Sequence, residues 1–181
     1  MTGQQLIISG VGGQGILFVT RMLAETAIRK GMPVMTSETH GMAQRGGVVI
    51  SHLKAGDFAS PLVRPGQANG LLALKAESVN LHRHFLCPGG WIVVNAPTPP
   101  VVDGHPVYAL DADHGARELG NPQAVNLIML GFALARLAPA GDLFCAVHEV
   151  IETVEHRLAE KGTLRSASLA ALRWGMEHAA P

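Results

Sequence analysis

The sequence predicts an α/β fold in which helices flank a mostly parallel β-sheet. A short apolar run, Leu6 to Ile8, leads into the glycine-rich segment GVGGQG at 10–15. An amphipathic helical pattern over about residues 14–30 follows at once. Further short apolar runs alternate with helical segments along the rest of the chain. A strand, a glycine turn and a helix in this order are typical of a Rossmann-like fold.

The remaining strands are predicted from their apolar runs. Residues 33–37 are the second strand, so about the first 36 residues form a strand–turn–helix–strand unit. Right-handed crossover would make this unit the opening of a parallel sheet. Further strands are expected at about 48–53, 70–75, 90–96 and 105–110, with a helix over 75–86.

Three helices are expected in the C-terminal part. Asn121 can cap a helix that has Pro122 at its first position. The following segment, 124–137, is apolar almost all round and is therefore expected in the core or in an interface. Amphipathic patterns predict two more helices, over about 142–160 and 165–178. With no repeat and no linker, residues 1–181 are expected to form one domain.

Composition limits the classes of function. The chain has a net charge of zero, 48% hydrophobic residues and 15% charged residues. A basic footprint for nucleic acid is therefore absent, and much apolar surface must go into a core or against partner subunits. The longest apolar stretch is too short to span a bilayer, and the N-terminus does not resemble a signal peptide. We therefore expect a cytoplasmic protein without a membrane partner, and two isolated cysteines fit that compartment.

The glycine segment leaves two interpretations open. Gly10 would permit a tight turn out of the strand, Gly12 would let an anion approach the backbone, and Gly15 would let the helix pack against the strand. The helix N-terminus then offers free N–H groups and partial positive charge to a phosphate. The alternative is a strand-to-helix turn that is needed for packing alone.

A polar loop, ETHGMAQRGG at 38–47, follows the second strand. Glu38 stands where a dinucleotide site places its ribose-binding acid. Arg45 lies beside two glycines and can clamp a carboxylate or a phosphate. The alternative for this segment is an ordinary surface loop.

The segments GVGGQGILFVTRMLAETAIRKG and SETHGMAQRGGVVISHL together resemble the gamma-type subunit or domain of 2-oxoacid:ferredoxin oxidoreductases. The form THGMAQRGG is most similar to the small subunit of indolepyruvate ferredoxin oxidoreductase. The resemblance is strongest over 6–54 and continues loosely to about residue 135. It implies two functional segments, a turn that faces coenzyme A phosphates or a partner, and a loop at the inter-subunit surface. The turn residues are Gly10, Gly12, Gly13, Gln14 and Gly15, and the loop residues are His40, Gly41, Gln44, Arg45, Gly46 and Gly47.

The same resemblance implies an accessory role without a catalytic residue. Enzymes of this family decarboxylate a 2-oxoacid oxidatively, form an acyl-coenzyme A and pass electrons to ferredoxin. Thiamine diphosphate and the iron–sulfur clusters would belong to partner subunits, and ferredoxin would be an indirect partner. Only two cysteines are present, whereas a cluster needs about four thiolates.

Two alternatives remain open. A free-standing NAD(P)- or flavin-binding reductase would use Glu38 for the ribose, and a homodimeric structural module would use its glycines for packing. A homodimer of the isolated chain is compatible with each hypothesis.

His82 and His84 are expected at a solvated helix end, because side chains two apart on a helix do not share a metal. The sequence predicts no metal site.

Overall fold

The computed structural model describes residues 3–40 and 47–179. They contain a six-stranded sheet in the order β2-β3-β1-β4-β5-β6. The strands are β1 (Gln4–Val11), β2 (Val34–His40), β3 (Val48–Ala55), β4 (Ala68–Ala73), β5 (Leu86–Asn95) and β6 (Val107–Leu110). Strands β1, β4, β5 and β6 are parallel neighbours, and β3 runs antiparallel to both β1 and β2. The predicted α/β fold with a mostly parallel sheet is confirmed.

The sequence predicted that the first two strands would begin a parallel sheet, and this prediction is wrong about which strand pairs with β1. β1 and β2 run in the same direction but are not neighbours, because β3 lies between them and pairs with both. Only residues 41–47 connect β2 to β3. A parallel crossover needs about a dozen residues or more, so this short connection is compatible only with antiparallel pairing.

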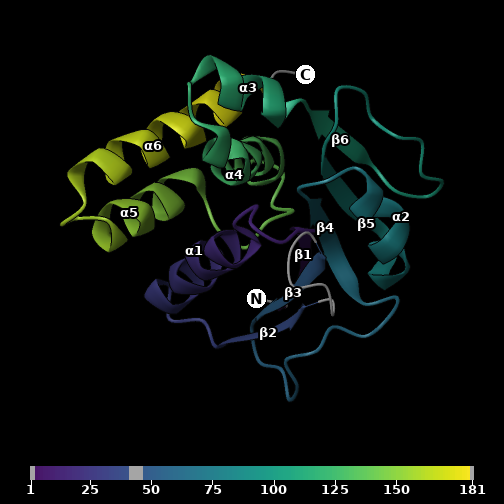
Figure 1. Cartoon of the computed structure of the whole chain (residues 1–181). Coiled ribbons are helices and arrows are strands. Elements are labelled where there is room, and N and C mark those ends of the chain that lie inside the picture. The colour runs from purple at the N-terminus through teal and green to yellow at the C-terminus, as the bar shows by residue number, and fades with distance from the viewer. Residues whose placement is uncertain (1–2, 41–46, 180–181) are drawn as a thin grey trace.

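The helices lie unequally on the two faces of the sheet (Figure 1). α1 (Ile16–Arg29) and α4 (Val125–Leu137) cover one face, and α5 (Val147–Arg157) and α6 (Gly162–Glu177) pack outside them. The short helix α2 (Glu77–His82) lies on the opposite face. The expected helix at 75–86 is shorter than predicted, since a 3-10 turn replaces it over 83–85. A further helix, α3 (Ala112–Glu118), was not predicted and is capped by the Asp111 carboxylate, which accepts from the His114 N–H.

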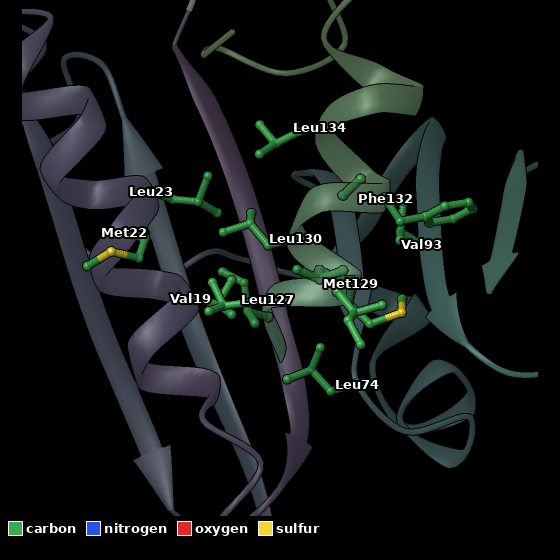
Figure 2. Close-up of a cluster of buried hydrophobic side chains, with 14 of the residues drawn as sticks. Val19, Met22, Leu23, Leu74, Val93, Leu127, Met129, Leu130, Phe132 and Leu134 are labelled. Atoms are coloured by element: carbon green, nitrogen blue, oxygen red, sulfur yellow. The ribbon is translucent and has the colours of Figure 1, made fainter. Parts of the chain in front are cut away.

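Successive side chains along each strand point to opposite faces of the sheet, and the apolar ones form one cluster on each face. Ile8 and Val93 face the helices α1 and α4, whereas Ile7 and Ile92 face α2. Figure 2 shows side chains of α1 and α4 meeting over the sheet in the larger cluster. α4 is buried along almost its whole length, which confirms its predicted place in the core. No helix in the described part of the chain has the length and apolar character that a membrane span needs.

Candidate functional site

The glycine turn is held in place by the side chain of Gln14. Its Oε1 accepts from the Val11 N–H at 2.9 Å, and its Nε2 donates to the Leu74 carbonyl at 3.0 Å. These bonds join the carboxyl ends of β1 and β4. A Cβ on Gly10 would lie 2.5 Å from Gln14 Oε1 and 3.1 Å from Leu74 Cβ. The Gln14 amide is thus used inside the protein, where it fixes the shape of the turn.

Positive φ angles occur at two glycines of the turn, Gly13 with 95° and Gly15 with 76°. Gly10 was expected to permit the turn, but it lies inside β1 and has no positive φ. Gly10 is required instead because Gln14 and Leu74 leave no room for a side chain. Gly13 has open space around it.

Gly15 packs against α4. The sequence predicted instead that this glycine would let the helix pack against the strand. A Cβ on Gly15 would collide with the Asn126 side-chain amide. Asn126 Nδ2 donates to the Gly15 carbonyl at 3.4 Å, and its Oδ1 accepts from the Leu127 N–H at 2.8 Å. Sequence reasoning missed Asn126, although an asparagine inside the otherwise apolar run AVNLIML is a signal for such a role.

Backbone N–H groups at the start of α1 remain available. α1 has no side-chain cap and no acidic residue in its first turn. Among the described residues, no backbone carbonyl accepts from the N–H groups of Gly13, Gly15, Ile16 or Leu17. Such donors, together with the helix dipole, favour an anion.

A cavity of about 310 Å³ opens beside the turn. Its walls come from the glycine turn, from the start of α1, from residues 121–127 and from one side of α6. The residues that line it are Gly13, Gln14, Gly15, Phe18, Asn121, Gln123, Ala124, Asn126, Leu127, Leu164, Ala167, Ser168 and Ala171. The predicted cap is confirmed here, since Asn121 Oδ1 accepts from the Gln123 N–H at 3.2 Å and Pro122 follows it.

The second sequence motif meets the first through its last residue. The Gly12 N–H donates to the Gly47 carbonyl at 2.9 Å, and Val11 pairs with Val48. His40 is the last residue of β2. Gly41, Gln44, Arg45 and Gly46 lie outside the described residues.

Glu38 does not lie where a dinucleotide ribose would need it. Glu38 of β2 pairs with Ser51 of β3, and Ser51 pairs on its other side with Ile8 of β1. Ile8 is three residues before the end of β1. Two strand spacings of about 4.8 Å separate β2 from β1, because β3 is inserted. The side chain of Glu38 is exposed. This geometry argues against the dinucleotide interpretation of the turn.

The histidines at the end of α2 and in the following 3-10 turn differ from the solvated pair that the sequence predicts. His82 is only 9% exposed, and neither ring nitrogen has a hydrogen-bond partner in the described structure. Burial, with smaller effects from His84 and His52, lowers the pKa of His82 to about 4. His84 is exposed. Within residues 3–40 and 47–179, no group of three or more His, Cys, Asp or Glu side chains is arranged to hold a metal ion.

The two cysteines do not fit an iron–sulfur cluster. Cys87 and Cys145 are both free thiols, and burial raises the pKa of Cys145 to about 12. A cluster needs about four thiolates, and the whole chain has two cysteines. A cluster would therefore need cysteines from outside this chain.

Comparisons with known proteins agree with the fold and with the family that the sequence resembles. The family model described as pyruvate ferredoxin/flavodoxin oxidoreductase matches residues 5–178. The indolepyruvate oxidoreductase subunit IorB of Archaeoglobus fulgidus is 30% identical, and the alignment covers 96% of this chain and 94% of that protein.

Two solved structures share the fold. The gamma subunit of a keto/oxoacid ferredoxin oxidoreductase from Geobacter sulfurreducens superposes with a TM-score of 0.76 at 24% identity, covering 97% of this chain and 98% of that chain. A 2-oxoglutarate:ferredoxin oxidoreductase from Magnetococcus marinus, with 2-oxoglutarate, coenzyme A and succinyl-CoA bound, superposes with a TM-score of 0.81 at 21% identity. That match covers 99% of this chain but 31% of the longer one. By its sequence, the chain belongs to the pyruvate ferredoxin/flavodoxin oxidoreductase family.

Proposed function

We propose that this chain is the small, non-catalytic subunit of a multi-subunit 2-oxoacid:ferredoxin oxidoreductase that acts on indolepyruvate. The observation that carries the proposal is the alignment with an indolepyruvate oxidoreductase subunit over nearly the full length of both chains. The protein is a subunit of the same size class as that relative, and its larger partner would contain the catalytic cofactors.

The chemistry of the chain favours a supporting role. The described residues around the glycine turn include backbone amides, amide side chains and one hydroxyl, but no acid, base or thiol that lines the cavity. Such groups bind and orient a ligand without moving protons. Thiamine diphosphate and iron–sulfur clusters therefore belong, in this proposal, to partner subunits, and ferredoxin is an indirect partner.

Coenzyme A is the ligand that we propose for the glycine turn. It supplies the thiol that accepts the acyl group in this class of reaction. The N–H groups of Gly13, Gly15, Ile16 and Leu17 would hold its phosphates, and the Gln14 side chain keeps these donors in position. Gly10 and Gly12 shape the turn from the strand side, through the close contact with Leu74 and the bond to Gly47.

The loop from His40 to Gly47 would contact the partner subunit. The hydrogen bond between Gly12 and Gly47 joins this loop to the glycine turn. A ligand on the turn and a subunit on the loop would therefore bind adjoining segments. We also propose a cytoplasmic location, because two free thiols suit a reducing compartment.

Anaerobic co-expression with the large subunit of the same host tests the proposal. We expect a stable complex that contains iron and thiamine diphosphate and reduces ferredoxin with indolepyruvate and coenzyme A. The small subunit alone should be inactive, and pyruvate and 2-oxoglutarate should be poorer substrates. A small subunit that elutes alone, or a large subunit with full activity in its absence, would contradict the proposal.

A further inference from the structure

Strand β2 forms an edge of the sheet that has no partner strand among the described residues. β2 is the first strand in the order of the sheet, has seven residues and pairs with β3 on its inner side (Figure 1). The opposite edge, β6, has only four residues. The side chains of Thr36, Glu38 and Thr39 are exposed. A long exposed edge is a template for the addition of another strand.

Two hydrogen bonds show which backbone groups of β2 point outward. The Gly56 N–H donates to the Pro33 carbonyl at 2.8 Å, and the Gly12 N–H donates to the Gly47 carbonyl at 2.9 Å. Because hydrogen-bonded pairs alternate along antiparallel strands, even-numbered residues of β3 bond to β2 and odd-numbered ones bond to β1. Every second residue of β2 therefore directs its N–H and C=O away from the sheet. These residues are Val34, Thr36, Glu38 and His40.

β2 lacks the features that usually keep an edge strand from pairing. Its register with β3 is continuous from Val34 to His40, without a bulge. The strand contains no proline and no lysine, and Glu38 is its one carboxylate. Natural edges are usually protected by such residues, by bulges or by a short strand. An edge without this protection is suited to bind a further strand.

We propose that a second copy of this chain adds its own β2 to this edge, antiparallel and about a two-fold axis at Ser37. In this register Thr36 lies opposite Glu38 of the second copy, and Val34 lies opposite His40. All outward-pointing backbone groups of both strands are then paired. The two six-stranded sheets join into one continuous sheet. The pairing needs neither a ligand on the glycine turn nor another subunit.

The side chains favour this register and a second copy as the occupant. An axis at Thr36 would leave His40 without a partner in β2, and an axis at Glu38 would place two carboxylates opposite each other. With the axis at Ser37, the Thr36 hydroxyl can donate to the Glu38 carboxylate of the second copy, and this contact occurs twice. A strand of a different protein would have to match this pattern by its own sequence, whereas a second copy matches it by symmetry.

Sedimentation velocity of the full chain, without other subunits, tests the pairing. We expect a reversible equilibrium between the 19.1 kDa chain and a species of twice that mass at about 1–100 μM. Thr36→Asp should weaken the dimer about tenfold, because it places like charges opposite each other at two symmetric contacts. Thr36→Lys is the matched control at the same exposed position, and it should keep or tighten the dimer because it lies opposite Glu38.

A cysteine on the axis tests the register. In the proposed pairing the two copies of Ser37 form a non-hydrogen-bonded pair with Cα atoms about 4.5 Å apart, which a disulfide can bridge. Ser37→Cys should therefore give a covalent dimer on mild oxidation. Thr39→Cys is the control, because residue 39 lies opposite Met35 and its two copies are beyond the reach of a disulfide. Both variants also carry Cys87→Ser, which removes a partly exposed free thiol.

The results separate a second copy from other occupants of the edge. A dimer that Thr36→Asp weakens and Ser37→Cys cross-links would support the strand pairing. A chain that stays monomeric up to about 1 mM, or equal cross-linking by both cysteine variants, would overturn it. A monomer whose binding to the large subunit of the proposed complex is blocked by Thr36→Asp would also overturn it and assign the edge to that subunit. Activity of the assembled complex is measured separately, so neither proposal decides the other.

Discussion

At the scale of single residues, Gly13 and Gly15 show two different reasons for glycine within one turn. Both have positive φ angles, where a side chain is strained. Gly13 has open space around it, whereas Gly15 lies against the Asn126 amide. A substitution at Gly13 therefore changes only the backbone preference, and one at Gly15 also disturbs the contact between the turn and α4.

We predict that alanine is tolerated better at Gly13 than at Gly15. Gly13→Ala should cost about 1–2 kcal/mol of unfolding free energy for the left-handed backbone. Gly15→Ala should cost roughly 1–3 kcal/mol more because Asn126 must move. Urea unfolding of the two variants measures the difference, and equal losses would contradict the role given to Asn126.

His82 is a second residue whose environment has a measurable consequence. Its ring lies edge-on to Phe85, with the ring centroids 6.3 Å apart, and both nitrogens lack partners in the described structure. His52, on β3, also has its pKa lowered, by burial and by Lys54. Protonation of either ring would place an unpaired charge in the cluster under α2.

We predict that acid destabilises the fold through His82. Its pKa of about 4 in the folded state lies below the ordinary value of 6.5, so the unfolded chain binds more protons between these values. The contribution of neutral His82 to the unfolding free energy is therefore fully present above pH 6.5. About 3 kcal/mol of it is lost as the pH drops to 4. His82→Leu should flatten the curve of unfolding free energy against pH in this range. His156→Leu, at an exposed site, should leave the slope unchanged.

At the scale of elements, α4 and α6 approach each other through glycine. A Cβ on Gly131 would meet the Leu172 carbonyl, and one on Gly175 would meet the Ile128 carbonyl. The neighbours are backbone atoms, which cannot move aside as the end of a side chain can. This close crossing brings Ser168, one turn before Leu172, to the cavity at the start of α4.

We predict that Gly175→Ala forces the two helices apart. The expected loss is about 3 kcal/mol or more, at the upper end of the cost of overpacking. Gly162→Ala, at the open first position of α6, should be neutral or stabilise the helix by up to about 1 kcal/mol. Thermal unfolding of both variants is the measurement, and similar melting temperatures would disprove the close crossing.

Sequence patterns predicted the elements better than their arrangement. The apolar runs and the Asn121–Pro122 cap are local signals, and the corresponding strands and helices are present. The insertion of β3 depends on the length of the connection and on pairing across the sheet, which no local pattern shows. The residues of the candidate site show the same difference between local signals and tertiary arrangement. The glycine turn was visible in the sequence, whereas Ser168 reaches it only through the packing of α6 on α4.

At the scale of the whole molecule, the strand order decides between the hypotheses for the turn. With β3 between β1 and β2, the exposed Glu38 lies on the edge strand, away from the glycine turn. The turn keeps donors for a phosphate but lacks the neighbouring acid that a nicotinamide dinucleotide requires. The position of Glu38 therefore argues against the free-standing reductase that uses this residue for the ribose.

We predict that NADPH and NADH do not bind this chain in the micromolar range. A fluorescence titration of the full chain should show no saturation at these concentrations. Saturable binding that is lost in Glu38→Ala would contradict this expectation and favour the free-standing reductase.

A last prediction concerns assembly. Arg45 lies outside the described residues, and its role rests on its place in the Arg-Gly-Gly segment. Arg45→Ala should weaken the complex with the large subunit or raise the KM for coenzyme A, without changing the melting temperature of the subunit. Arg83→Ala, at an exposed position after α2, is the matched control. Unchanged assembly and unchanged kinetics in the Arg45 variant would refute the assignment.

The bond from the Gly12 N–H to the Gly47 carbonyl has a thermodynamic consequence. In the proposed function the glycine turn binds a ligand and the loop from His40 to Gly47 binds a subunit, so through this contact each binding event would bias the conformation of the other segment. Binding free energies are reciprocal, and a subunit that docks on the loop and tightens the ligand tenfold must itself be held tenfold more tightly when the ligand is present. Loss of the ligand would then loosen the complex, and subunit exchange would report on the supply of ligand.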